Sequence, residues 1–262
     1  MAPFFSWADG MLKWFSDWLR QRRARSIPVA ASQWAAAESE VPALHGLPPS
    51  DRERLRRLVL QFLADKEWTG AAGLELTPHM QLVIALQACL PILNLGLDWY
   101  DDWRGIVVYP EEFAVNRRVT DDIGLVHEYE DHLMGEAWDN GPVVVSWFPV
   151  EHRPDNVNPV IHEFAHALDL HRGNADGMPR LHAGMSRADW AKDFGEAYAD
   201  LCRRVDNGGE TPLDPYATTA PAEFFAVASE VFFDAPEKLA HAYPKVYGQL
   251  SRFYRQDPLR RP

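Results

Sequence analysis

Apolar residues recur at helical spacing in the first third of the chain. Over residues 50–66 they fall at intervals of three and four, which predicts an amphipathic helix with one buried face. Residues 80–97 contain no charged side chain and are long enough to raise the alternative of a membrane-spanning helix. Pro91 would kink such a helix and polar residues interrupt it, so we expect a buried core helix that ends near Leu90 and leads into a turn.

Short β-branched runs predict two strands in the middle of the chain. Residues 106–110 (IVVYP) and 143–147 (VVVSW) are both bounded by Gly and Pro. Residues 111–140 between them lack a clear period, although residues 127–130 could extend a strand. Downstream, the pattern predicts a loop over 173–186, a helix over 189–204 and a turn-rich stretch over 207–215.

The first 25 residues differ in charge from the rest of the chain. They carry a net charge of +3, whereas the whole chain carries −12. Their apolar residues recur at helical spacing, which predicts a basic amphipathic N-terminal helix over residues 1–25. Such a helix can pack on the body of the protein or lie on an anionic membrane surface, and both alternatives stay open. Asp9, Lys13 and Asp17 interrupt every apolar stretch, so we do not expect a secretory signal peptide.

Composition narrows the classes of function. A chain of 262 residues with 47% hydrophobic residues can bury a sizeable core. Its acidic balance argues against direct nucleic-acid binding, which depends on clustered Lys and Arg. Cys89 and Cys202 lie far apart and outside any CxxC motif, so we expect two buried free thiols, no disulfide and no cysteine metal site. This usage of cysteine indicates a cytoplasmic location.

The pentapeptide His162-Glu163-Phe164-Ala165-His166 is an HExxH motif. On a helix, residues four apart share a face, so both imidazoles can bind one zinc ion while Glu163 lies beside a water on that ion. Asn158 is a suitable N-cap, Pro159 suits the first helical position, and a glycine at 173 offers a stop. We therefore expect a helix over about 159–172.

A catalytic zinc site needs a third protein ligand. The metzincin pattern requires Gly and His where this chain has Asp169 and Arg172, so that class is excluded and a glutamate is expected instead. Glu196 and Glu223 are both candidates on later helical segments. Apolar neighbours after Pro221 would bury Glu223, where a carboxylate needs a partner, so the pattern favours Glu223 without excluding Glu196.

Five segments resemble the Mlc titration factor A family of zinc-dependent peptidases. They are IALQACLPILNLGLDWY (84–100), IVVYPEEF (106–113), DDIGLVHE (121–128), IHEFAHALD (161–169) and DPYATTAPAEFFAVASEVFF (214–233). The resemblance covers most of residues 26–258 and leaves out the first 25. This family is in turn similar to the catalytic domain of anthrax lethal factor.

The resemblance implies a fold and an architecture. The expected fold is a helix-rich α+β metallopeptidase domain of the zincin type, in the gluzincin class, with a small mixed β-sheet and an active-site HExxH helix. We expect residues 26–262 to form a single zinc peptidase domain. Its helical lobe would span about 26–103 and its catalytic lobe about 104–262.

The resemblance also assigns roles to individual residues. It implies that His162, His166 and Glu223 bind one zinc ion and that Glu163 is the general base. Tyr216 lies seven residues before Glu223, the offset at which the lethal factor domain has a tyrosine facing its metal, so Tyr216 becomes a candidate donor to the oxyanion.

Other parts of the site are expected from spacing and analogy. Asp169 lies one turn past His166 and Glu230 two turns past Glu223, so either carboxylate could orient a ligand or could be simply solvated. Strand 143–147 is expected, by analogy with such peptidases, to offer an exposed sheet edge to an extended substrate.

Two main functions remain in competition. The first is a cytoplasmic zinc peptidase that hydrolyses peptide bonds, in the manner of an aminopeptidase or on short peptides. The second is a regulatory protein that sequesters a transcriptional repressor, because the family takes its name from binding Mlc, a glucose-responsive repressor. A weaker alternative is a peripheral membrane peptidase held by residues 1–25.

Overall fold

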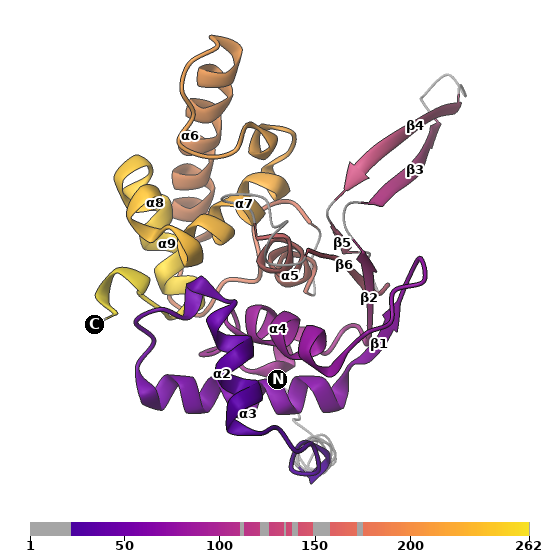
Figure 1. The fold of residues 1–262 in the computed structure, drawn as a ribbon. Coiled ribbons are helices and arrows are strands. Elements are labelled where there is room, and N and C mark those ends of the chain that lie inside the picture. Colours follow the sequence, from indigo (N-terminus) through magenta and orange to yellow (C-terminus); the bar gives the residue numbers. More distant parts are fainter. Residues whose placement is uncertain are drawn as a thin grey trace, which may run out of the picture.

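The structure is a computed structural model that describes residues 22–110, 113–120, 126–133, 135–137, 141–148, 158–171 and 175–261, with backbone alone between 113 and 137. It is a helix-rich α+β fold (Figure 1). The α-helices are α2 (Ala31–Ser39), α3 (Pro49–Asp65), α4 (Pro78–Cys89), α5 (Pro159–Leu170), α6 (Arg187–Asp206), α7 (Pro221–Asp234), α8 (Pro236–Ala242) and α9 (Pro244–Tyr254). Short 3-10 helices are η1 (Pro42–Leu44), η2 (Leu97–Tyr100), η4 (Pro215–Thr218) and η5 (Pro258–Arg260).

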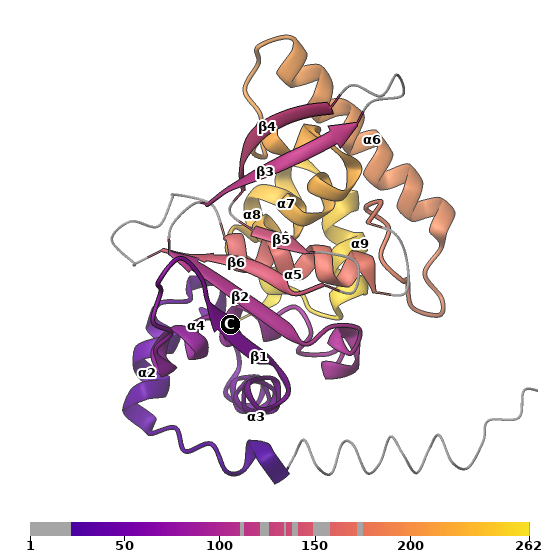
Figure 2. The same ribbon diagram turned by 90° about the vertical axis from the view of Figure 1, so that its right-hand side faces the viewer.

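A small mixed sheet lies beside α5. Its strands run in the order β1 (Glu67–Gly70), β2 (Gly105–Pro110), β6 (Val143–Trp147) and β5 (Gly135–Ala137), as Figure 2 shows. The first three are parallel, and β5 runs antiparallel to β6. Ile106 and Val108 of β2 are buried, as are Val143 and Val145 of β6, which explains the apolar runs in their sequences.

The position of β6 corrects the expectation for residues 143–147. This strand pairs with β2 on one side and with β5 on the other, so it is internal to the sheet and offers no edge. The strand order is set by contacts between distant segments, which the sequence pattern does not report. Among the described strands, β5 is the edge next to the HExxH helix.

Strands β3 (Phe113–Thr120) and β4 (Val126–Leu133) form a separate antiparallel pair. This hairpin extends away from the helical body (Figure 1). Residues 127–130, which by their sequence could extend a strand, lie within β4, and the sequence did not predict the rest of this pair.

Aromatic packing anchors α5 to the N-terminal helices. Phe164 is fully buried, and its ring centroid lies 5.7 Å from that of Phe62 on α3. It also lies 5.3 Å from the ring of Tyr100 and 5.6 Å from the ring of Trp103. Rings at such separations add attraction beyond the area that they bury. Phe164 thus fixes one face of α5 to the core, and the two histidines of the motif lie on another face.

A second aromatic group holds the C-terminal helices together. Trp190 stacks on Phe194 at 4.2 Å within α6, and it contacts Phe253 of α9 at 5.8 Å. Phe225 of α7 lies 6.0 Å from Trp190 and 6.1 Å from Phe253. Helix α7, which supplies the acidic candidate Glu223, is therefore packed against α6 and α9. Helix α5 lies between this group and the N-terminal helices (Figure 1).

Most helices expected from the sequence are confirmed. The expected segments over 50–66 and 189–204 correspond to α3 and α6, and α4 is a buried helix that ends beside Leu90. No described helix has the length and apolar character that crossing a membrane requires. Helix α5 ends at Leu170, two residues before the expected end, and the glycine stop at 173 lies outside the described residues. Strand β1 was not foreseen.

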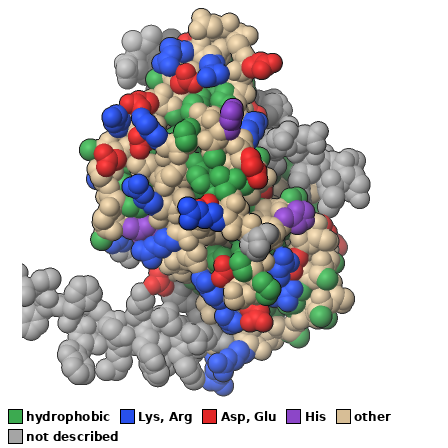
Figure 3. All heavy atoms as spheres, turned by 90° about the vertical axis from the view of Figure 1, so that its left-hand side faces the viewer, with side chains coloured by type: hydrophobic (Ala, Val, Ile, Leu, Met, Phe, Trp, Pro, Cys, Tyr) green, Lys and Arg blue, Asp and Glu red, His purple; other side chains and the backbone are tan. Residues whose placement is uncertain are grey.

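Some expectations are settled only in part. Cys89 and Cys202 are both free thiols, but only Cys89 is buried and Cys202 is partly exposed. The amphipathic segment falls mainly on residues 1–21, outside the described residues, and the division into two lobes stays a prediction. On the face drawn in Figure 3, basic and acidic side chains are interspersed rather than gathered by sign. The expectation of no direct nucleic-acid binding stays a prediction.

Candidate metal centre

The HExxH motif lies in the middle of α5. The Asn158 side chain accepts a hydrogen bond from the backbone N–H of Ile161 at 3.0 Å, and Pro159 occupies the first turn, so the expected N-cap is confirmed. His162 and His166 are one turn apart on the same face, and their ring centroids are 4.8 Å apart. The local sequence alone therefore brings two imidazoles together.

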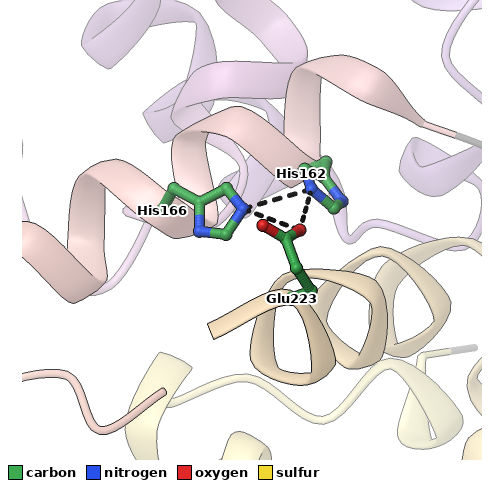
Figure 4. Close-up of side chains that lie close together, drawn as sticks. All are labelled: His162, His166 and Glu223. Atoms are coloured by element: carbon green, nitrogen blue, oxygen red, sulfur yellow. Dashed lines mark hydrogen bonds and ion pairs between the residues drawn. The ribbon is translucent and has the colours of Figure 1, made fainter. Parts of the chain in front are cut away.

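Helix α7 supplies the third side chain from the other side. Figure 4 shows Glu223 pointing from α7 toward His162 and His166 on α5. Its Oε2 atom lies 3.0 Å from His162 Nε2 and 3.2 Å from His166 Nε2. The two Nε2 atoms are themselves 3.2 Å apart. Among the described residues, these three form the one group of His, Cys, Asp or Glu side chains whose ligand atoms all lie within 4.8 Å.

This group fits a tetrahedral metal ion. Zinc binds imidazole and carboxylate ligands at about 2.0–2.2 Å, which places neighbouring ligand atoms roughly 3.3 Å apart. The separations of 3.0 and 3.2 Å are close to that value. Two histidines and one carboxylate also leave a fourth position open, as catalytic sites do and closed structural sites do not. Three protein ligands and an open position are what metal-assisted hydrolysis needs.

Glu230 fixes the orientation of His162. Its Oε1 atom lies 2.6 Å from His162 Nδ1, and its Oε2 accepts a hydrogen bond from the backbone N–H of Asn158 at 2.8 Å. Glu230 is only 5% exposed. When Nδ1 donates its proton to Glu230, the Nε2 lone pair is left to face the centre of the group. Glu230 is therefore a contact of the candidate ligand, and the solvated alternative does not hold.

The carboxylates also shift the proton affinities of the site. Burial lowers the pKa of His162, but contacts with Glu223 and Glu230, and the charge of Glu163, outweigh it and raise the pKa well above its usual value. Burial raises the pKa of Glu223, and its contacts with His162 and His166 outweigh that effect, so the pKa falls far below its usual range.

Glu163 and Tyr216 differ in their exposure to solvent. Glu163 is 3% exposed within α5. Tyr216 lies in η4, where Asp214 caps the turn by accepting the Tyr216 backbone N–H at 2.8 Å. The Tyr216 ring is 6.1 Å from that of His162, and the residue is 42% exposed. A large aromatic residue is thus held beside the candidate ligands and open to solvent.

Asp169 and Glu196 are placed differently from the candidate ligands. Asp169 is 1% exposed and accepts a hydrogen bond from the Gly177 backbone N–H at 2.7 Å, so it too is not solvated. Glu196 is an exposed residue of α6, and its carboxylate pairs with Lys245 Nζ at 2.8 Å. The structure therefore brings Glu223 to the histidines and leaves Glu196 on the surface.

One contact of the site was not foreseen. The Asn158 side-chain amide donates to Asp234 Oδ2 at 3.0 Å, so the residue that caps α5 also binds the last residue of α7. The sequence predicted Asn158 as the N-cap of α5. That role accounts for one hydrogen bond of Asn158 but not for the partners of its other polar atoms.

The helix-rich α+β fold and this group of side chains are consistent with a metallopeptidase. A sequence profile of the glucose-regulated metallo-peptidase M90 family matches residues 15–255, and the chain belongs to this family. Similar proteins named Mlc titration factor A include one from Klebsiella pneumoniae (strain 342), 40% identical over 84% of this chain and 85% of its own length. Others come from Cronobacter sakazakii (38%) and Escherichia coli strain 55989 (37%), each covering 96% of this chain and 94% of the relative.

Replacing Glu223 should remove metal from the protein. We expect Glu223→Ala to lower zinc content sharply, because two imidazoles alone bind zinc much less well than three ligands do. Glu196→Ala is the matched control, since it removes an exposed glutamate of the other candidate helix. Metal analysis of the purified proteins measures the outcome. Unchanged zinc in Glu223→Ala together with loss in Glu196→Ala would reverse the assignment.

Asp169 should make stability depend on pH. Burial raises its pKa to about 7 from the ordinary 3.8, although the Gly177 hydrogen bond opposes this. The folded state therefore holds the proton more tightly than the unfolded state, so this group's contribution to stability is largest below about pH 4 and falls until pH passes about 7. The full loss is on the order of 4 kcal/mol.

The Asp169→Asn variant isolates this effect. Asn has no titrating group and its side-chain oxygen still accepts the Gly177 N–H, so the free energy of unfolding should fall less between pH 5 and pH 8 than in the wild type. Urea unfolding of both proteins in EDTA across that range gives the comparison. Parallel pH profiles would contradict the raised pKa.

Proposed function

We propose that the protein is a zinc-dependent peptidase of the gluzincin class, with His162, His166 and Glu223 as the zinc ligands. The single observation that carries this proposal is the meeting of three ligand atoms from α5 and α7 within 4.8 Å. The donor set supports it, because two imidazoles and a carboxylate are the ligands of hydrolytic zinc sites. When bound there, zinc would supply Lewis-acid polarisation of the scissile carbonyl and acidify a coordinated water.

Glu163 is proposed as the general base. It lies directly after the first histidine on α5 and is almost fully buried, so its position is fixed by the helix. Its carboxylate would take a proton from the attacking water and pass that proton to the leaving amine. Glu230 would hold His162 by its Nδ1 atom while this happens.

Tyr216 is proposed to stabilise the developing negative charge on the carbonyl oxygen. Its ring lies beside that of His162, and the residue is 42% exposed, so its hydroxyl can reach a substrate on the open side. A phenol donates a strong hydrogen bond to an oxyanion because its own proton is retained at neutral pH.

The edge strand β5 is proposed to bind the substrate backbone. Strand β5 packs beside α5, and among the described strands it pairs only with β6. Its outer side can therefore add an extended peptide by backbone hydrogen bonds. This edge supports an extended peptide, rather than a folded protein surface, as the proposed substrate class. A peptide library with free and blocked amino termini would tell an aminopeptidase from an endopeptidase.

Glu163→Gln should separate zinc binding from hydrolysis. The amide cannot take a proton, so peptide cleavage should fall by at least about 100-fold while zinc content stays at the wild-type level. Glu237→Gln, on the exposed first turn of α8, is the control, because it makes the same chemical change away from the site. Full activity in zinc-replete Glu163→Gln would remove Glu163 from its proposed role.

A second proposed function is titration of a Mlc-type transcriptional repressor. The observation that favours it is the name of the relatives, Mlc titration factor A, which extends to proteins similar over 96% of this chain. The acidic balance of −12 suits a DNA-binding partner with a basic surface. This partner would place the protein in the cytoplasm, with both thiols reduced.

Binding to a purified Mlc-type repressor should persist when catalysis is lost. We expect Glu163→Gln to bind the repressor with wild-type affinity in surface plasmon resonance, since that buried residue adds nothing to the surface. Binding should weaken as salt rises, because opposite charges are screened. An unrelated repressor of similar charge is the control, and equal binding to both would contradict a specific partner.

A further inference from the structure

The backbone of Gly177 is held by two helices at once. Its N–H donates to Asp169 Oδ2 near the end of α5 at 2.7 Å, and its carbonyl accepts a hydrogen bond from Trp190 Nε1 of α6 at 2.9 Å. Asp169 and Trp190 are each 1% exposed, so both hydrogen bonds are shielded from water. Buried hydrogen bonds of this kind fix the position of a backbone segment, since breaking either would leave an unsatisfied polar group.

Gly177 also lies directly against the start of α7. Its φ is +79°, and a Cβ atom added there would lie 2.4 Å from the carbonyl oxygen of Pro221 and 2.8 Å from its carbonyl carbon. No side chain can occupy that space unless the backbones separate. Pro221 is the first residue of α7 and stands two residues before Glu223. The glycine therefore lets the loop touch the turn that carries the proposed third ligand.

The first turn of α7 is packed through Phe224 against the rings of Phe194 and Tyr198, but it has no side-chain cap. Its N-cap is Ala220, which provides no side-chain hydrogen bond to the helix. The opposite end of α7 is tied to the start of α5, where Glu230 and Asp234 both bond to Asn158. Contacts at the Gly177 end thus complete the attachment of α7 to α5, from the end nearer Glu223.

We propose that Asp169, Gly177 and Trp190 form a clamp that sets the distance of Glu223 from the two histidines, and so sets the affinity for zinc. They are positioning residues, since they act through the first turn of α7 and touch no ligand atom. The inference rests on the proposed function only in taking Glu223 as a zinc ligand. Changes to contacts that orient metal ligands typically weaken metal binding by about 10–100-fold.

The closing experiment compares two glycine variants of the full chain. Gly177→Ala adds a methyl group against Pro221, whereas Gly184→Ala has a similar backbone strain, at φ +90°, with no atom within 4 Å of the added methyl. Zinc dissociation constants come from competition with a chromophoric chelator. We expect about 10–100-fold weaker binding for Gly177→Ala and a change of less than about twofold for Gly184→Ala. The visible spectrum of bound cobalt should shift in Gly177→Ala alone.

A pair of Asp169 variants tests the same clamp without the added methyl. Asp169→Ala removes the acceptor of the Gly177 N–H and should weaken zinc binding, and Asp169→Asn keeps an acceptor oxygen and should restore it. This pair of variants still tests the clamp if Gly177→Ala does not fold. Equal zinc affinity in Gly177→Ala and Gly184→Ala, or wild-type affinity in Asp169→Ala, would overturn the proposal.

Glu223→Ala distinguishes a failure of the clamp from a failure of the zinc site. If it loses zinc while the clamp variants do not, the clamp fails and the zinc site stands. If Glu223→Ala keeps zinc, the ligand assignment fails and the clamp fails with it. None of these readouts depends on peptide cleavage, so a protein with zinc and no activity would leave the clamp intact and overturn only the peptidase assignment.

Discussion

Helices α5 and α7 must keep both their separation and their register, because the candidate metal centre consists of atoms from both. They run antiparallel: Asn158 at the start of α5 bonds to Asp234 at the end of α7, while Asp169 near the end of α5 holds the loop that touches Pro221. A shift of one residue along either helix would move a ligand by about 1.5 Å, which is most of a metal–ligand bond. The three ligand atoms can meet only while both ends are held.

The rest of the fold supports this pair of helices from two sides. Phe164 joins α5 to a group of buried rings from α3 and the segment around Tyr100, and the sheet lies along another face of the same helix. Phe225 joins α7 to α6 and α9. Interiors packed to crystal-like density deform little, so these contacts hold the helices in place more firmly than the polar contacts of the site could alone.

The sequence predicted best those features that depend on residues close together in the chain. The HExxH spacing, the Asn158 cap and Pro159 act within one helix, and the structure shows them as expected. The choice between Glu196 and Glu223 is not local: both are acidic residues on helices after α5, and only the packing of α6 and α7 leaves one exposed and brings the other to the histidines. The residue pattern favoured Glu223 without excluding Glu196, and the family resemblance then implied Glu223.

The predictions that failed concern features that depend on contacts between distant segments of the chain. Strand β1 has four residues and one large apolar side chain, too few for a pattern to predict it, and it forms because its backbone pairs with β2. Strand β6 was expected at an edge, but strand order depends on which distant segments meet. Gly177 stands in a loop rich in Gly and Pro, where nothing in the sequence tells a glycine that touches another helix from one that faces solvent, as Gly184 does.

The two proposed functions place different demands on this architecture. Hydrolysis needs ligand positions held to within about 0.5 Å, and that accuracy depends on contacts at both ends of α5 and α7. Binding a repressor needs a surface of suitable shape and charge, which tolerates small shifts between buried helices. The contacts at Asn158 and Gly177 join α5, α6 and α7 to one another. They stabilise the fold whichever function the protein has, but only a metal centre depends on the distance that they set between Glu223 and the two histidines.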